Sequence, residues 1–239
     1  MSSRFPKITQ AVIMAGGAGS RLAPLTRSLP KPLVPVGNIP IIEILIRQLV
    51  KSGIREIIIA LGKQGSLIRT YLSDGKSWKV KIRYSVENKP LGTVGPLRLI
   101  DGLKPNFLVL NGDLLTDLNF KELFAAHYRL KAPATVAICR RSVKSDFGVV
   151  TSRGGRIVSY AEKPRSAWDV SMGIYALSRE SLKNIPRRRF DFPELISKLA
   201  GSSRPPAVFR FKGVWLDIGR LEDWKKADRL FAQNPKKFI

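Results

Sequence analysis

The chain has 239 residues, of which 44% are hydrophobic, and this is enough for a sizeable core and excludes a disordered chain. It carries 42 Lys and Arg residues against 18 Asp and Glu residues, and the resulting formal charge of +24 attracts polyanions over long range. No apolar run is long enough to span a bilayer, and the lone Cys139 cannot form an internal disulfide, so we expect a soluble, cytoplasmic protein with Cys139 in its core.

The first 132 residues alternate strand and helix patterns. The patterns predict strands over 8–15, 55–61, 79–87 and 107–113, and helices over 39–53, 64–75, 95–103 and 119–130. This order predicts a Rossmann-like α/β fold, in which helices flank both faces of a mainly parallel sheet. Ligands of such sheets bind at the carboxyl ends of the strands, where the glycines of the first loop and Asp113 both lie.

The pattern changes after about residue 133. Strands are expected over 134–140, 146–162, 170–177 and within 207–219, and helices over 190–200 and 221–231. We predict that this part forms a smaller, mixed lobe that covers the crevice, and that the tail 234–239 frays.

The segment 11–38, AVIMAGGAGSRLAPLTRSLPKPLVPVGN, concentrates residues that suit phosphate binding. Its GGAGSRL loop lacks the last glycine of a dinucleotide fingerprint and the ending of a P-loop. Glycines after a strand still expose N–H groups to phosphate oxygens, and Arg21 and Lys31 add positive charge. Pro30 and Pro32 restrict the backbone around Lys31. Taken alone, Gly16, Gly17 and Gly19 are equally compatible with a tight turn, and the prolines with a linker or with a polyproline II ligand through the PxxP at Pro32 to Pro35.

The run 16–43, GGAGSRLAPLTRSLPKPLVPVGNIPIIE, resembles the opening of sugar-1-phosphate nucleotidylyltransferases, which make nucleotide sugars and share roughly the pattern GGxGTRLxPLTxxxPKPLxPVxxxPxIE. Further segments follow in the family's order: ENKPLGTVGPL, LVLNGDLLTD, FGVV, YAEKP, MGIYAL and GVWLDIGRLEDWKKA. The resemblance is closest to guanylyltransferases for mannose or heptose 1-phosphate. It implies one nucleotidyltransferase domain, with a nucleotide-binding part over 8–132 and a sugar-binding part over 133–232.

In the implied reaction, a sugar 1-phosphate attacks the α-phosphate of a nucleoside triphosphate and pyrophosphate leaves. The attacking phosphate is largely ionised near neutral pH because its second pKa is about 6, so no general base is needed. We therefore interpret the single histidine, His127, as structural. The reaction needs alignment and charge neutralisation, and the resemblance implies Mg²⁺ bound by Asp113 and Asp217. Asp117 and Asp146 are interpreted as turn or cap residues.

The resemblance assigns the other site residues by position. Arg21 would hold the triphosphate and Lys31 the reacting phosphates. The nucleotide would lie against Ala15, Gly16, Gly17, Gly19, Glu87, Gly92 and Thr93. The sugar phosphate would lie against Gly148, Glu162, Lys163 and Ser171, with Lys163 neutralising the phosphate and Glu162 accepting hydrogen bonds from sugar hydroxyls.

Glu87 indicates which base the bound nucleotide carries. Related enzymes that use uridine or thymidine triphosphates usually carry glutamine here, which both donates and accepts hydrogen bonds, whereas a carboxylate only accepts. Guanine offers two adjacent donors, so Glu87 favours GTP; a Glu87 turned toward solvent would leave UTP, dTTP or CTP open. The guanine argument favours mannose or heptose 1-phosphate as the sugar, although Ser171 replaces an asparagine of many relatives and changes the hydroxyl contacts.

Three other functions remain open from the sequence. A glycosyltransferase on a similar fold would leave the segment with Arg21 and Lys31 unexplained. A non-catalytic sensor of nucleotide sugars would not need to retain all of the charged residues assigned above. Nucleic-acid binding rests on net charge alone, because the basic residues are scattered and no known nucleic-acid module accompanies them. We expect no specific nucleic-acid partner and no membrane span, and an oligomer remains possible.

Overall fold

The computed structural model describes residues 7–17, 20–62 and 65–239. A seven-stranded sheet forms the body, in the order β12-β8-β11-β6-β1-β4-β5. The bounds of its strands are β1 Gln10–Met14, β4 Glu56–Leu61, β5 Lys81–Val86, β6 Asn106–Asn111, β8 Ala134–Lys144, β11 Arg165–Ser178 and β12 Ala207–Phe211. The ladders β6–β1, β1–β4, β4–β5 and β12–β8 are parallel, and β11 runs antiparallel to both of its neighbours. The predicted Rossmann-like, mainly parallel fold is confirmed.

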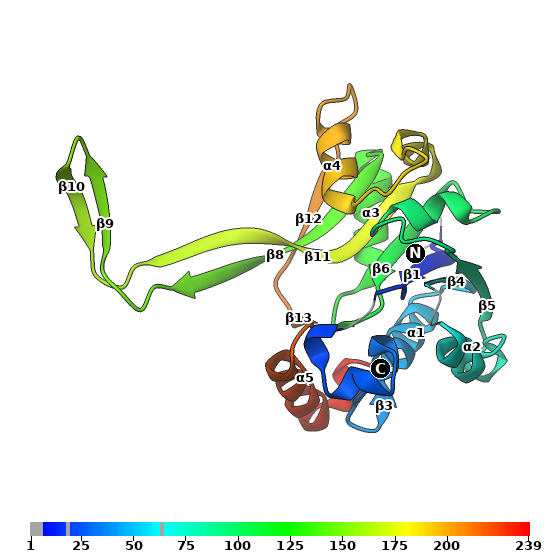
Figure 1. The fold of residues 1–239 in the computed structure, drawn as a ribbon. Coiled ribbons are helices and arrows are strands. Elements are labelled where there is room, and N and C mark those ends of the chain that lie inside the picture. Colours follow the sequence, from blue (N-terminus) through cyan, green and yellow to red (C-terminus); the bar gives the residue numbers. More distant parts are fainter. Residues whose placement is uncertain (1–6, 18–19, 63–64) are drawn as a thin grey trace, which may run out of the picture.

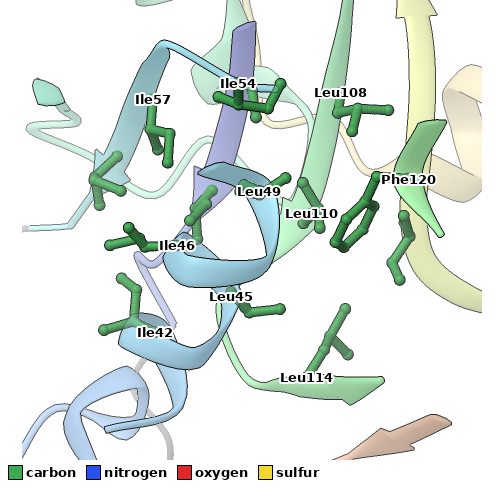
Figure 2. Close-up of a cluster of buried hydrophobic side chains, with 14 of the residues drawn as sticks. Ile42, Leu45, Ile46, Leu49, Ile54, Ile57, Leu108, Leu110, Leu114 and Phe120 are labelled. Carbon is green, nitrogen blue, oxygen red and sulfur yellow. The ribbon is translucent and has the colours of Figure 1, made fainter. Parts of the chain in front are cut away.

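Alternation along the buried strands explains why both faces of the sheet are covered. Ile57 and Leu108 join a cluster on one face, against α1 (Ile41–Lys51), α2 (Ser66–Leu72) and α3 (Phe120–Leu130). Figure 2 shows α1 directing Leu45 and Leu49 toward these strands. The intervening side chains of the same strands face the opposite way, where α4 (Phe192–Ala200) packs. The central strands β1, β4 and β6 are therefore buried on both faces, as expected for a doubly wound sheet.

A third hydrophobic cluster holds the carboxyl-terminal part against the phosphate-binding segment. It joins Leu22 and Val34 to Phe231 of α5 (Leu221–Gln233) and to Phe238. Phe238 is only 1% exposed, with its ring 6.0 Å from that of Phe231. The prediction that the tail frays is therefore wrong for this residue, because burying a large aromatic side chain outweighs the polar character of the residues before it.

Two short antiparallel ladders and one predicted helix complete the body. β7 (Leu114–Thr116) pairs with β13 (Trp215–Asp217), and β2 (Pro35–Val36) pairs with β3 (Ile39–Pro40). The helix expected over 95–103 is a short 3₁₀ helix, Gly95–Leu99. It ends early because Gly102 turns the chain with a positive φ of 71°.

An arm projects from the body (Figure 1), built from the outer halves of β8 and β11 and ending in the hairpin β9 (Val149–Arg153) and β10 (Arg156–Ala161). The sheet itself continues across residue 133, because β8 and β11 belong to the same sheet as β6. The lobe predicted to cover the crevice is thus partly body and partly an arm that points away from it. Local strand patterns do not encode this direction.

None of the helices in the described ranges combines the length and the apolar character needed to cross a membrane.

Candidate active site

The carboxyl ends of four neighbouring strands meet at one edge of the sheet and form the floor of a pocket. Backbone hydrogen bonds tie these ends together: Ala15 N–H donates to Ala60 O (2.8 Å) and Gly112 N–H donates to Met14 O (2.9 Å). The pocket above has a volume of about 500 Å³. Its lining includes the predicted residues Gly16, Gly17, Arg21, Lys31, Glu87, Gly92, Thr93 and Asp113.

The glycine loop comes close to the neighbouring strand ends. A Cβ added to Gly16 would lie 3.2 Å from Gly62 N and 3.3 Å from Glu87 Oε1, so this position favours glycine. Gly17 has open space around it, and Ala15 is buried beneath the loop. The predicted residue Gly19 lies outside the described residues. The described part of the loop therefore leaves room for a ligand above the ends of the strands.

Lys31 enters the pocket from a 3₁₀ turn, Lys31–Leu33. Leu33 N–H donates to Pro30 O (2.8 Å), and Pro32 and Leu33 are buried, so the turn is anchored on both sides of the lysine. The side chain is only 11% exposed. Its ammonium group forms an ion pair with Asp113 and lies 3.9 Å from Asp217 Oδ1. The prolines fix the backbone of this lysine, as the sequence predicts.

Asp113 and Asp217 come together through the β7–β13 ladder. Asp113 follows β6, Asp217 pairs with Leu114, and Ile218 N–H donates to Asp113 O (3.0 Å). Burial and the nearby charge of Asp113 raise the pKa of Asp217, while the positive charges of Lys31 and Arg21 lower it. Two carboxylates thus share one small region with two cations.

The donor set in this region fits a divalent cation. Asp113 Oδ1 is buried and has no hydrogen-bond partner among the described residues. The described residues hold no group of three or more His, Cys, Asp and Glu side chains arranged for a metal, and Asp113 and Asp217 are the two carboxylates beside the Lys31 ammonium group. Mg²⁺ commonly takes one or two carboxylates and completes its shell with phosphate oxygens and waters. A pair of carboxylates in an anion-binding pocket suits that pattern.

Glu87 lies at the end of β5 and faces the pocket rather than bulk solvent. Its backbone N–H donates to Leu61 O (3.0 Å), and its carboxylate Oε2 accepts from Leu91 N–H (2.9 Å). The side chain therefore also closes the loop over 88–91. The other carboxylate oxygen lies on the side of Gly16.

Gly92 and Thr93 rest on the start of α4. Thr93 N–H donates to Asp191 Oδ1 (2.6 Å), and Phe192 N–H donates to Thr93 Oγ1 (2.9 Å). A Cβ on Gly92, which has a φ of +86°, would lie 2.5 Å from Phe190 O. Thr93 thus caps α4, in addition to the contact with the base that the resemblance implies.

Sequence reasoning missed two charged residues of the pocket, Arg189 and Asp191. Arg189 belongs to the short basic cluster Arg187-Arg188-Arg189, one of the scattered basic groups to which the sequence analysis gave no role in the site. The signal for its position is the helix start that follows, where Asp191 and Glu194 form a capping box. That helix docks on Thr93 and brings the preceding arginine to the pocket.

The predicted sugar-binding residues do not line this pocket. Ser171 is near it: its hydroxyl lies 3.2 Å from the Tyr175 hydroxyl, and a Cβ on Gly173 would lie 2.5 Å from the pocket residue Asn111. Glu162, Lys163 and Gly148 belong to the distal part of the arm. A Cβ on Gly148 would lie 2.2 Å from the Tyr160 hydroxyl, which in turn donates to Glu162 Oε2 (3.1 Å).

The residues interpreted as structural have structural contacts. His127 is 1% exposed and bonds Thr135 and Asn106. Asp117 accepts from Val214 N–H (2.6 Å) and pairs with Lys237. Cys139 packs against the core, and burial raises the pKa of its thiol.

The fold and the pocket define an α/β protein with a glycine-lined pocket of charged side chains at the carboxyl edge of its sheet. Within that class, the chain belongs to the nucleotidyl transferase family, whose model matches residues 10–234. The resemblance to sugar-1-phosphate nucleotidylyltransferases is confirmed by its relatives. The chain is 33% identical to mannose-1-phosphate guanylyltransferase 1 of Arabidopsis thaliana over 95% of its own length and 66% of that protein's. It is 31% identical to a mannose-1-phosphate guanyltransferase of Aspergillus fumigatus, over 96% and 69% of the two chains. It thus spans about two thirds of the length of these relatives.

Solved structures agree with this assignment. A Bacillus anthracis protein described as a glucose-1-phosphate thymidylyltransferase, in complex with a sucrose, has a TM-score of 0.76 at 25% identity and covers 93% of this chain and 94% of its own. HddC from Yersinia pseudotuberculosis complexed with GMP-PN has a TM-score of 0.72 at 25% identity, covering 94% of this chain and all of its own.

Proposed function

We propose that the protein transfers a nucleotidyl group from a nucleoside triphosphate to a sugar 1-phosphate, giving a nucleotide sugar and pyrophosphate. The observation that carries this proposal is Lys31, anchored by its prolines beside Asp113 and Asp217 at the mouth of the glycine loop. Membership of the nucleotidyl transferase family supports the same chemistry.

The residues of the pocket suit each part of the reaction. Arg21 and Lys31 would neutralise the triphosphate and the charge that builds up on the departing pyrophosphate. An oxygen of the sugar phosphate attacks the α-phosphorus while the bond from phosphorus to the bridging oxygen of the pyrophosphate breaks, with no proton to remove first. The protein then acts mainly by alignment and by preorganised charge.

Asp113 and Asp217 would hold the Mg²⁺ ion that we propose as the cofactor. The unpartnered Oδ1 of Asp113 supports this role. When bound, Mg²⁺ neutralises phosphate charge and helps to orient the triphosphate.

We propose GTP as the nucleotide and mannose 1-phosphate as the first sugar substrate to test, with a heptose 1-phosphate second. Glu87 faces the pocket with one oxygen bonded to Leu91 N–H, and a carboxylate suits the adjacent donors of guanine. The named activity of the Arabidopsis and Aspergillus relatives and the GMP-PN complex of the Yersinia protein agree with guanine and, for the relatives, with mannose.

The test is pyrophosphate release in the presence of Mg²⁺, with GTP, UTP, dTTP, CTP and ATP each combined with glucose, mannose and heptose 1-phosphates. We expect release that requires both substrates and is fastest with GTP. Release that does not require a sugar 1-phosphate would contradict transfer to a sugar. No release with any pair, while GTP still binds, would contradict catalysis and favour a nucleotide-sugar sensor.

A further inference from the structure

The arm (residues 140–169) places an unusual amount of apolar surface in water. Among the described residues, eight of the sixteen exposed large hydrophobic side chains belong to it. The most exposed are Phe147 at 79%, Ile157 at 69%, Val158 at 64% and Tyr160 at 63%. Every residue of β9 and β10 is exposed. Adjacent residues of a regular strand point to opposite faces, so the exposed neighbours Val149 and Val150 make both faces of the hairpin apolar, which is typical of a surface that another chain covers.

The arm is held away from the pocket of its own chain. β8 and β11 pair residue by residue from Ser171 and Ile138 to Arg165 and Lys144. These seven residue pairs span about 20 Å at the usual rise of a strand. The tip (residues 146–163) lies beyond that ribbon, and Figure 1 shows it far from the body.

Side chains at the root of the arm support this direction. Arg141 stacks on Trp215, with its guanidinium carbon 4.9 Å from the ring centre, and donates to Trp215 O (2.8 Å). Asp169 pairs with Arg140 and Arg210. Exposed ion pairs contribute little individually, but here they add to the seven consecutive pairs of the outer ladder, whose register shift lies between Ser171 and Tyr175, where the arm joins the body.

The tip nevertheless carries groups suited to a polar ligand. Tyr160 donates to Glu162, and Gly148 leaves room for the Tyr160 ring. Lys163 next to them has a φ of +45°, in the left-handed region that a lysine adopts only under constraint. An acid, a phenol and a lysine are therefore presented outside the pocket that the described residues of their own chain form at the carboxyl edge of the sheet.

We propose that two copies of the chain exchange arms, so that the tip of each lies over the pocket of the other and supplies Glu162 and Lys163 to its sugar phosphate. The sugar role of these two residues rests on the proposed function. A second copy is the partner that fits, because it carries the matching pocket, and because exchange of identical elements between protomers forms a symmetric dimer at low cost. The exchange would also cover the apolar side chains of the tip.

The exchange itself is tested by sedimentation velocity of the full chain in 0.15 M salt, where repulsion between the positively charged copies is screened within about 8 Å. We expect a dimer, and monomers for Phe147→Asp and Ile157→Asp, whose side chains are too exposed to matter for folding of one chain. Leu99→Asp, at an exposed apolar side chain of the body, is the matched control and should stay dimeric. A monomeric wild-type protein, or a dimer that persists in both tip variants, would overturn the proposal.

The shared site is tested by co-expressing Lys31→Ala and Lys163→Ala chains with different affinity tags and purifying the mixed dimer. Each variant alone should lose at least about tenfold in activity, because a charged phosphate contact is removed. In the mixed dimer, the pocket of the Lys163→Ala chain receives an intact arm, so about half of the wild-type activity should return. No recovery in a dimer of this composition would place arm and pocket in the same chain and refute the exchange.

The two proposals fail separately. If the wild-type protein releases no pyrophosphate with any substrate pair, the proposed function and the sugar role of the tip are both wrong. The sedimentation result for the tip variants still decides whether copies exchange arms.

Discussion

Lowering the pH should destabilise the protein through its only histidine. His127 is buried, with Nε2 3.1 Å from Asn106 Oδ1 and Nδ1 2.9 Å from Thr135 Oγ1. Asn106 Oδ1 can only accept, so Nε2 carries the proton and Nδ1 accepts from the threonine hydroxyl. This is the neutral ring, and burial lowers its pKa from 6.5 to about 4.

The size of the effect follows from the two pKa values. Because the folded state binds the proton more weakly than the unfolded state, the stability that His127 contributes is full above about pH 6.5 and is lost as the pH falls toward 4. At pH 5, protonation of His127 stabilises the unfolded state relative to the folded state by about 2 kcal/mol. Near pH 4 the resulting loss of folding stability reaches about 3 kcal/mol. The free energy of unfolding should therefore fall by about 2 kcal/mol between pH 7.5 and pH 5.

Urea unfolding followed by tryptophan fluorescence measures this difference at the two pH values. His127→Gln is the matched control, since glutamine offers a donor and an acceptor but does not titrate. Its free energy of unfolding should change less over the same range, and the difference between the two proteins isolates the histidine from the carboxylates. Equal pH dependence in both proteins would refute the assignment of a neutral, buried ring.

Three further predictions concern the pocket and the tail. Lys31→Ala should lower kcat by about 100-fold or more while circular dichroism stays native, because it removes a preorganised charge from the reacting phosphates; near-normal turnover would contradict its role. Glu87→Gln keeps an acceptor for Leu91 N–H, so it should leave the loop closed and lower kcat/KM for GTP relative to UTP; an unchanged ratio would mean that this side chain does not read the base. Phe238→Ala should lower the free energy of unfolding in urea by about 3–5 kcal/mol, as for other buried phenylalanines. The exposed control Leu99→Ala should lower it by less than about 0.5 kcal/mol. Equal losses in the two variants would mean that the tail is not packed.

The parts of the fold with a local signal could be predicted from the sequence. The buried strands β1, β4 and β6 are short apolar runs, and the helix α1 has apolar residues at helical spacing, so their types follow from periodicity. The position of Asp113 and the glycine loop at one edge follows from parallel strand order alone.

What depends on packing between distant segments could not be predicted in this way. Residues 165–169 extend β11 well before the expected start at residue 170, because they pair with β8 outside the body rather than with an apolar core. The hydrophobic pattern is therefore absent where the arm begins. Arg189 reaches the pocket only because α4 docks on Thr93, a contact between segments almost a hundred residues apart in the chain.

The arrangement around Lys31 is better explained by ligand binding than by stability of the fold. An ion pair that only stabilises the fold satisfies its polar atoms, whereas Asp113 Oδ1 is buried with no partner among the described residues. Burial and the nearby charge of Asp113 raise the pKa of Asp217, although Lys31 and Arg21 lie close to it. The fold therefore places two acids and two cations close together. A bound cation would neutralise the acids, and a polyanionic ligand would neutralise the cations. The presence of both kinds of charge is the physical reason to expect both a metal ion and a triphosphate in this pocket.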